Sequence, residues 1–127
     1  MKKAVCLISG GMDSFVSAAI AKNKGYEIYA LTVNYGQKNK KEILSAIKIA
    51  EFLKAERHLI AKTDLSWTKS ALTDLRIKIP QKIRQGEIPS TYVPARNTIF
   101  IALALALAET IDAEAIFIGV NAVDFSG

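Results

Sequence analysis

Residues 9–14, with the sequence SGGMDS, decide how the rest of the chain is expected to fold. They follow residues 4–8, a short apolar run that predicts a buried parallel strand, and they lead into a predicted helix over residues 14–24. A strand, a glycine turn and a helix start place free N–H groups and the positive end of the helix dipole at one point, which favours an anion. Gly10 and Gly11 permit positive φ and close approach of a ligand to the backbone.

The side chains of this turn include groups that favour a bound phosphate and one group that opposes it. The hydroxyls of Ser9 and Ser14 are donors, whereas the carboxylate of Asp13 would repel a phosphate unless it caps the helix or a cation such as Mg²⁺ lies between them. The two common nucleotide signatures are absent from the turn, and Gly and Ser also form ordinary strand-to-helix turns. The candidate phosphate-binding residues are Ser9, Gly10, Gly11, Met12, Asp13 and Ser14.

The composition bounds the class of protein. Of the 127 residues, 50% are hydrophobic and 23% are charged, which predicts one globular domain. The net charge of +5 favours an anionic partner, although a modest excess of Lys and Arg is also typical of a solvated surface. The single cysteine, Cys6, fits a reducing compartment and a core position. Residues 99–108 form the longest apolar run, which is shorter than the about 20 residues that span a bilayer. We therefore expect a cytoplasmic protein with no leader segment and no membrane partner.

Strands and helices alternate along the first half of the chain. Residues 26–34 predict a second strand, residues 38–54 an amphipathic helix and residues 57–61 a third strand. His58, on the third strand, is expected to have no role in a site. The pattern is that of an α/β protein with a parallel sheet and helices on both of its faces.

The second half is less regular. Residues 64–75 predict one or two helices with Trp67 on one face, and residues 76–84 alternate cationic and aliphatic side chains. That alternation indicates either a basic ribbon that touches a polyanion or a solvated excursion of the chain. Asn97 is predicted to cap a helix that runs to about residue 111, and residues 115–120 predict a fourth strand.

The predicted strand order is 3-2-1-4, which brings four segments to one edge of the sheet. These segments are residues 9–14, 34–38, 96–97 and 119–124. Arg96 is the best single anion ligand among them because its guanidinium can grip a phosphate or carboxylate with two hydrogen bonds, although a surface arginine beside a helix is the alternative. Within these residues nothing follows the fourth strand to cover the sheet, so we expect an apolar surface there that a partner or further sequence covers.

The loop resembles the S-G-G-x-D-S loop of the PP-loop ATP pyrophosphatases, a superfamily with a Rossmann-like fold of the adenine nucleotide α-hydrolase type. Three further stretches narrow the resemblance to the 7-cyano-7-deazaguanine synthases of queuosine and archaeosine biosynthesis. They are residues 34–42 (NYGQKNKKE), residues 89–97 (PSTYVPARN) and residues 119–127 (GVNAVDFSG). The resemblance covers the whole chain and implies a single PP-loop nucleotide-binding domain.

Two departures from the family pattern stand out. Asn39 occupies a position where many relatives carry a histidine. The sequences of family members also continue for roughly the length of another half domain, in which cysteines bind a structural zinc ion. Cys6 cannot replace these cysteines. The resemblance therefore implies that the family's C-terminal part, with its Zn²⁺ ligands, is missing from these residues, and we expect little or no turnover from residues 1–127 alone.

The resemblance implies an ATP-dependent ligase that joins ammonia to 7-carboxy-7-deazaguanine, with ATP and Mg²⁺ as cofactors and a homodimer as the full-length assembly. No stable nucleic-acid partner is expected. The implied catalytic residues are Asp13, which is also the candidate Mg²⁺ ligand, Lys38 and Arg96. The implied substrate-binding residues are Tyr35, Gln37, Arg96, Asn97, Asn121 and Asp124. Two alternatives are an RNA-modifying adenylating enzyme that uses residues 76–84 and a non-catalytic nucleotide-binding module similar to universal stress proteins.

Overall fold

The computed structural model describes residues 1–36, 40–65, 67 and 96–119. Strands and helices alternate along these residues, as the sequence predicts. The strands are β1 (Lys3–Leu7), β2 (Glu27–Asn34), β3 (Arg57–Lys62) and β4 (Ala115–Phe117), and the helices are α1 (Met12–Asn23), α2 (Lys41–Phe52) and α3 (Arg96–Ile111).

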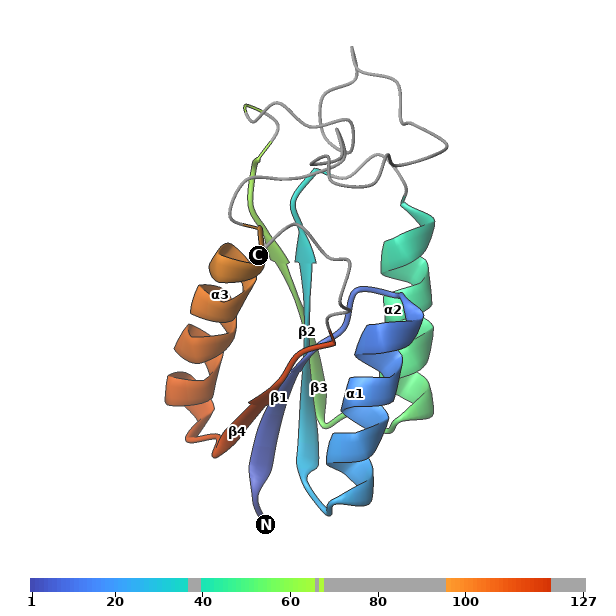
Figure 1. Ribbon diagram of the computed structural model, residues 1–127, viewed down its shortest axis with the longest axis vertical. Coiled ribbons are helices and arrows are strands. Elements are labelled where there is room, and N and C mark those ends of the chain that lie inside the picture. The colour runs from blue at the N-terminus through green and yellow to red at the C-terminus, as the bar shows by residue number, and fades with distance from the viewer. Residues whose placement is uncertain (37–39, 66, 68–95, 120–127) are drawn as a thin grey trace, which may run out of the picture.

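The four strands form one parallel sheet in the order β3-β2-β1-β4. This order confirms the prediction and places β1 in the interior of the sheet. Helices α1 and α2 cover one face of the sheet and α3 covers the other (Figure 1). The loop after β1 therefore begins between the ends of two neighbouring strands, which is where parallel α/β sheets bind their ligands.

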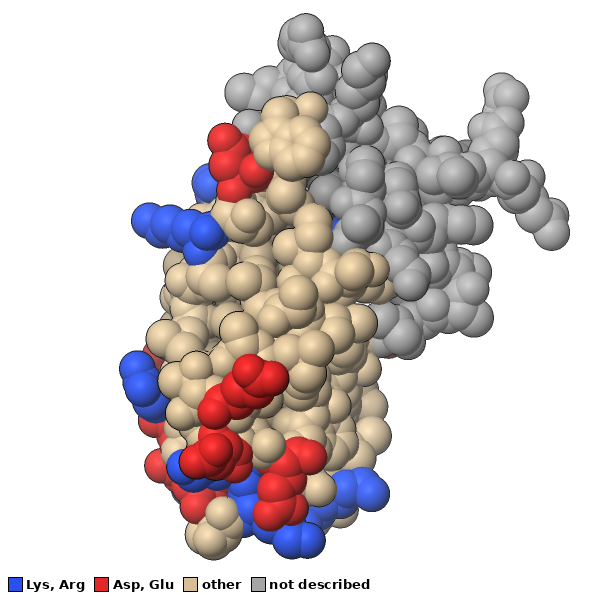
Figure 2. Space-filling model, turned by 90° about the vertical axis from the view of Figure 1, so that its left-hand side faces the viewer, with Lys and Arg blue, Asp and Glu red and all other residues tan. Residues whose placement is uncertain are grey.

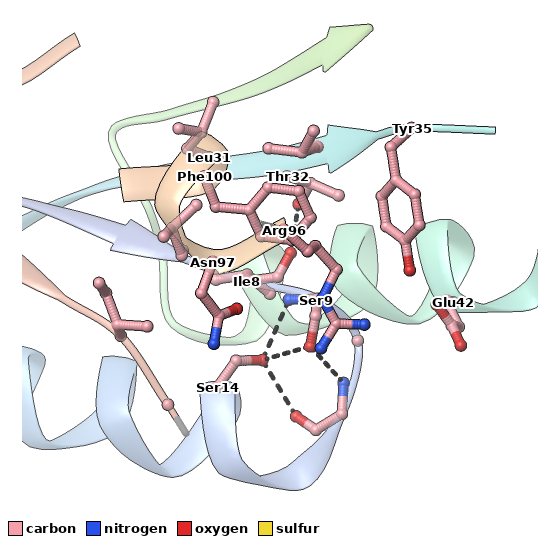
Figure 3. A pocket seen from close by; sticks show the side chains of 16 residues that line it. Ile8, Ser9, Ser14, Leu31, Thr32, Tyr35, Glu42, Arg96, Asn97 and Phe100 are labelled. Carbon is pink, nitrogen blue, oxygen red and sulfur yellow. Dashed lines mark hydrogen bonds between the residues drawn. The ribbon is translucent and has the colours of Figure 1, made fainter. Parts of the chain in front are cut away.

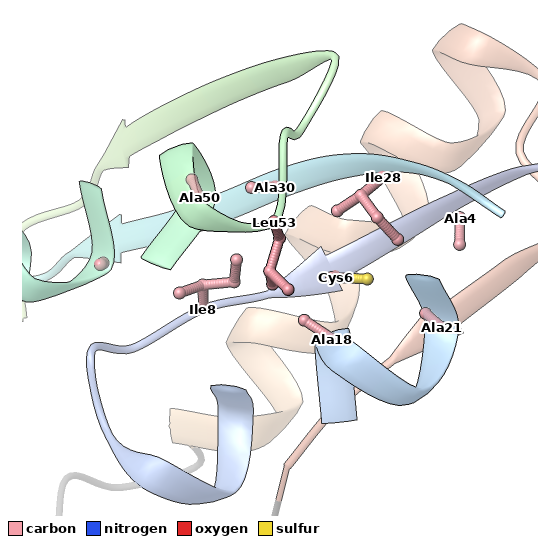
Figure 4. Packing of buried hydrophobic residues seen from close by; sticks show 10 residues of the cluster. Ala4, Cys6, Ile8, Ala18, Ala21, Ile28, Ala30, Ala50 and Leu53 are labelled. Atoms are coloured by element: carbon pink, nitrogen blue, oxygen red, sulfur yellow. The ribbon is translucent and has the colours of Figure 1, made fainter. Parts of the chain in front are cut away.

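Alternate residues of β1 serve the two faces of the sheet. Cys6 and Ile8 face α1 and α2, where they pack with alanines of both helices (Figure 4), and Val5 and Leu7 face α3. Alanine at the helix positions nearest the sheet lets the backbones approach closely, which gives a dense core without large side chains. Burial raises the pKa of Cys6 to about 12, so this thiol stays neutral and is a core residue, as predicted.

The predicted cap of α3 at Asn97 is wrong, and of the two alternatives left open for Asp13 the structure does not show the helix cap. The α1 helix begins at Met12, its N-cap is Gly11, and no side chain bonds the cap, so Asp13 lies inside the first turn and does not cap the helix. Similarly, α3 already includes Arg96, which places Asn97 in the first turn of the helix. An acidic residue in a first turn still interacts favourably with the helix dipole, which accounts for Asp13 at this position.

Smaller differences lie at the other element ends. The β4 strand ends at Phe117, so Gly119 lies beyond the sheet, and Val120 is outside the described residues. Asp64 and Leu65 are not helical, and the remainder of the helix predicted there, apart from Trp67, also lies outside them. Trp67 is 77% exposed, and its indole N–H donates to the carbonyl of Asp64 at 2.8 Å.

The face of the molecule that carries α3 is largely uncharged. Figure 2 shows most of the charged side chains toward the lower end of this face, a smaller group at its upper left and few across its centre. Ile101 and Leu105 on α3 are 38% and 50% exposed, and β4 is the last strand of the sheet on this side. Part of the outer surface of α3 is therefore apolar. Among the described residues, no helix combines the length and the apolar composition needed to cross a bilayer.

Candidate functional site

A cavity of about 280 Å³ lies at the carboxyl ends of β1 and β2. The loop after β1, the first turn of α3, one residue of α2 and the turn after β4 complete its wall (Figure 3). Its lining residues are Leu7, Ile8, Ser9, Gly10, Gly11, Ser14, Leu31, Thr32, Val33, Tyr35, Glu42, Arg96, Asn97, Phe100, Ile118 and Gly119. The cavity thus combines an apolar floor with backbone amides, hydroxyls and a few charged groups, which is the usual make-up of a small-molecule site.

Two serine hydroxyls shape the loop from inside (Figure 3). The Ser14 hydroxyl accepts from the N–H of Ser9 at 3.0 Å and donates to the carbonyl of Gly11 at 3.1 Å. The Ser9 hydroxyl lies 3.2 Å from that of Ser14 and accepts from the N–H of Gly11 at 3.3 Å. The sequence predicted these hydroxyls as donors to a phosphate. In the structure both hydroxyls form hydrogen bonds within the loop, and Ser14 is engaged as donor and acceptor.

The glycines of the site are explained by close backbone contacts. Gly10 has φ +93°, and a Cβ there would collide with the carbonyl group of Glu42 on α2. Gly119 lies equally close to the backbone of Asp13, so a side chain there would push β4 away from the first turn of α1. Gly11, in contrast, has an extended backbone with φ −91°, so positive φ is needed at Gly10 only.

Arg96 faces the loop from the start of α3. Figure 3 shows its guanidinium group between Ser9 and Glu42. The guanidinium carbon lies 6.0 Å from the centre of the Phe100 ring, and the Tyr35 ring lies 5.5 Å from the same ring. Arg96 also hydrogen-bonds the side chain of Tyr35. These contacts hold the guanidinium at the mouth of the cavity, where its planar donors suit a phosphate or carboxylate.

Two acidic groups near Arg96 have shifted pKa values. Burial raises the pKa of Glu42, and the nearby positive charge of Arg96 offsets part of that rise. Burial likewise raises the pKa of Tyr35, against the influence of Arg96, so the phenol stays protonated at neutral pH. Arg96 and Glu42 therefore bring opposite charges into one partly desolvated site.

Seven of the predicted site residues line the cavity. The fold brings them together from both halves of the chain. They are Ser9, Gly10, Gly11, Ser14, Tyr35, Arg96 and Asn97. Met12 and Asp13 are exposed and do not line the cavity. The other predicted residues, Gln37, Lys38, Asn121 and Asp124, lie outside the described residues, as does Asn39.

Nine of the sixteen lining residues were not among the predicted site residues, and Glu42, Thr32 and Phe100 are the ones most relevant to the chemistry of the site. Glu42 was part of a stretch that supported the resemblance, and its position near the start of a helix that follows the loop was the available signal. Thr32 and Phe100 lie within runs of apolar residues, where nothing in the sequence separates a cavity wall from a core. Among the described residues, no three His, Cys, Asp or Glu side chains gather as metal ligands.

A parallel sheet, a glycine loop after its first strand and an arginine facing that loop agree with the architecture of the PP-loop class, which the loop sequence resembles. The particular family follows from comparison with known sequences. The chain belongs to the family of the queuosine biosynthesis protein QueC, whose family model matches residues 3–127.

Curated relatives agree with this family. The 7-cyano-7-deazaguanine synthase of Microcystis aeruginosa is 53% identical over 128 residues, which cover 99% of this chain and 56% of that protein. The 7-cyano-7-deazaguanine synthase of Acetivibrio thermocellus is 50% identical over 127 residues, which cover 100% of this chain and 57% of that protein. The chain thus spans slightly more than half the length of these relatives.

Solved structures support the fold. The NH3-dependent NAD synthetase of Campylobacter jejuni has a TM-score of 0.56 at 18% identity, and covers 89% of this chain and 45% of its own. The NMN synthetase of Francisella tularensis has a TM-score of 0.59 at 17% identity, over 90% of this chain and 44% of its own. At these identities the likeness concerns the fold alone, and it agrees with the Rossmann-like class predicted from the sequence.

Proposed function

We propose that the protein is an ATP-dependent ligase that converts 7-carboxy-7-deazaguanine and ammonia to 7-cyano-7-deazaguanine. The observation that carries this proposal is the pairing of the loop at residues 9–14 with Arg96 across one cavity, in a chain of the QueC family. An anion held at the loop would meet backbone N–H groups on one side and a guanidinium on the other.

The reaction needs two adenylations by ATP, which activate the carboxyl carbon of the substrate first as the acid and then as the amide. A carboxylate oxygen of the substrate attacks the α-phosphorus of ATP, and pyrophosphate leaves. The nitrogen of ammonia then attacks the acyl carbon, AMP leaves, and a proton is lost to give the amide. The amide oxygen then attacks the α-phosphorus of a second ATP, and a second pyrophosphate leaves. Loss of AMP with that oxygen, together with the remaining N–H protons, leaves the nitrile. The protein's part is to position the reactants and to neutralise charge, without a side-chain nucleophile.

We assign roles to the site residues accordingly. The pyrophosphate part of ATP is held by the loop residues, mainly through their backbone N–H groups; these residues are Ser9, Gly10, Gly11, Met12, Asp13 and Ser14. Arg96 and Lys38 neutralise the phosphates or the substrate carboxylate. Asn121 and Asp124 bind the guanine-like edge of the substrate, because a carboxylate and an amide pair well with adjacent N–H donors. Tyr35, Gln37 and Asn97 complete the substrate wall.

Mg²⁺ belongs to the proposal as a companion of ATP. This cation is commonly bound by substrate phosphates and waters with only one or two protein carboxylates, so the site does not need an acidic cluster. Asp13 is our candidate ligand because it lies in the first turn of α1, next to the loop. When bound, the cation would neutralise the leaving pyrophosphate. Zn²⁺, the homodimer and the cytoplasmic location remain expectations from the family.

A binding experiment tests the site directly. We expect the chain to bind ATP with Mg²⁺, measured by isothermal titration calorimetry, and Arg96→Ala to weaken binding by at least about tenfold, as expected for loss of a charge-assisted hydrogen bond. Arg57→Ala is the matched control, since Arg57 is an exposed arginine on β3 that does not line the cavity. Equal losses in the two variants would show that Arg96 acts through net charge alone and would contradict the proposed site.

A further inference from the structure

A chain of two hydrogen bonds links the edge of the sheet to the start of the loop. The carbonyl oxygen of Ile8, the last residue before the loop, accepts from the Thr32 hydroxyl at 2.7 Å. The same hydroxyl oxygen lies 2.7 Å from Nε2 of His58 on β3. Thr32 is 2% exposed and lines the cavity, whereas His58 does not reach it. His58, the only histidine of the sequence, therefore touches the site through Thr32.

Counting protons fixes the direction of both bonds. A threonine hydroxyl has one proton, and a carbonyl oxygen can only accept. Since the Thr32 proton points to Ile8, the bond between Thr32 and His58 requires a proton on Nε2. Burial lowers the pKa of His58, which favours the neutral ring. A neutral ring with its proton on Nε2 satisfies the hydroxyl without placing a buried charge beside the core.

The Ile8 carbonyl matters because of the peptide that it belongs to. A peptide group is planar, so a bond that fixes the carbonyl of one residue also fixes the N–H of the next. The Thr32 bond thereby orients the N–H of Ser9, which donates to Ser14. The carbonyl of Gly10 is held in the same way by the hydroxyl of Ser45, at 3.0 Å, and this bond orients the N–H of Gly11.

Hydroxyls from three different elements thus hold three carbonyls at the start of the loop. Thr32 on β2 holds Ile8, Ser45 on α2 holds Gly10, and Ser14 on α1 holds Gly11. Of the three hydroxyls, the Thr32 hydroxyl is the one bonded to a titratable ring.

We propose that His58 is a positioning residue for the anion-binding loop, acting through the Thr32 hydroxyl to set the peptide between Ile8 and Ser9. The proposal depends on the proposed function only in taking a pyrophosphate group as the anion. His58 does not touch that anion. Its effect is to keep the loop in the shape that receives it.

The first test is nuclear magnetic resonance of the ¹⁵N-labelled chain without ligand. We expect the ring nitrogens of His58 to show a protonated Nε2 and a bare Nδ1 at neutral pH. We also expect His58→Leu and Thr32→Val to shift the amide signals of Ser9 and Gly11. His58→Gln and Thr32→Ser, which keep an N–H donor and a hydroxyl, should leave those signals near their wild-type positions. A bare Nε2, or unchanged amides in His58→Leu, would overturn the proposal.

The second test measures the affinity for inorganic pyrophosphate with Mg²⁺ by calorimetry. We expect His58→Leu to weaken binding about tenfold, the effect of one buried hydrogen bond, and His58→Gln to stay within about twofold of wild type. Equal weakening in the two variants would contradict a role for the N–H donor. Failure of the wild-type chain to bind pyrophosphate would instead contradict the proposed function, while the amide and ring signals would still decide the role of His58. Melting temperatures of all variants show whether each one folds.

Discussion

Gly10 and Gly25 have nearly the same backbone conformation but different surroundings. Their φ angles are +93° and +92°. A Cβ on Gly25 would meet nothing within 4 Å, whereas one on Gly10 would collide with the backbone of Glu42. Substitution of Gly25 therefore reports the free-energy cost of the backbone conformation alone, whereas substitution of Gly10 also includes the cost of displacing α2 from the loop.

We expect Gly25→Ala to lower the free energy of unfolding by about 1 kcal/mol, the ordinary cost of a left-handed conformation. Gly10→Ala should lower it by about 2–4 kcal/mol, because backbone must also move. It should abolish pyrophosphate binding, which Gly25→Ala should leave intact. Urea unfolding and calorimetry measure both effects. Equal stability losses in the two variants would contradict the close packing of α2 on the loop.

The lowered pKa of His58 predicts how stability depends on pH. Between the ordinary histidine pKa of 6.5 and the lower value in the fold, the unfolded chain binds a proton that the folded chain does not. The free energy of unfolding should therefore fall as pH is lowered through 6.5 and level off below the folded pKa. Urea unfolding from pH 8 to pH 5 tests this expectation.

His58→Gln is the control for the pH series, because it keeps the donor and removes the titration. The carboxyl of Glu42 has a raised pKa, but it titrates equally in both proteins and cancels in the difference. The difference in stability between wild type and variant should shrink or change sign toward pH 5. A difference that stays constant with pH would show that His58 titrates normally in the fold.

Individual site residues could be predicted from the sequence where the residue type itself indicates a chemical or conformational role. Arg96 and Gly10 line the cavity where they were expected, because the strand order brings the turn after β1 and the start of α3 to the same edge of the sheet. His58 was expected to have no role. Its contact with Thr32 depends on the register of β3 against β2, which pairs Ala30 with His58. The sequence of either strand alone does not determine this register.

At the scale of elements, α3 connects the core to the site. Ala104 on its inner side is fully buried in the cluster that includes Val5 and Leu7, and Arg96 and Phe100 lie on the first turns of the same helix. A rigid helix transmits a displacement along its length. Packing at Ala104 should therefore affect the position of Arg96 two turns away.

We expect Ala104→Leu to lower the free energy of unfolding by about 1–3 kcal/mol through overpacking. It should also weaken ATP binding, because the helix must lift from the sheet. Ala102→Leu, on the exposed side of the same helix, should change stability by no more than about 0.5 kcal/mol. Thermal unfolding and calorimetry test both variants. Intact ATP affinity in a destabilised Ala104→Leu would show that α3 does not position the site.

The types of the elements could be predicted because the apolar side chains that recur along a helix or strand are the ones that become buried. The strand order 3-2-1-4 and the placement of the helices follow from the parallel pattern and are confirmed. The helix caps could not be predicted from Asp13 and Asn97, since the α1 cap is Gly11 with no side-chain bond and α3 already begins at Arg96. In α1, the hydroxyl of Ser14 bonds the Gly11 carbonyl, a contact that depends on the loop's full shape.

At the scale of the whole molecule, the fold collects a site from segments that are distant in sequence. Ser14 and Gly119 lie 105 positions apart, yet both line one cavity with Arg96. This convergence follows from the strand order, which places the ends of β1, β2 and β4 at one edge. The chain spans slightly more than half the length of its curated relatives.

The measurement that tests the proposed reaction most directly uses a chimera. Residues 1–127 replace the matching region of the Microcystis aeruginosa 7-cyano-7-deazaguanine synthase, to which they are 53% identical. Release of AMP and pyrophosphate from ATP is followed with ammonium, Mg²⁺ and either 7-carboxy-7-deazaguanine or tRNA. We predict that AMP forms only with the deazaguanine, that Arg96→Ala in the chimera abolishes it, and that residues 1–127 alone give little turnover. A folded chimera that forms AMP with tRNA but not with the deazaguanine, or whose activity survives Arg96→Ala, would contradict the account.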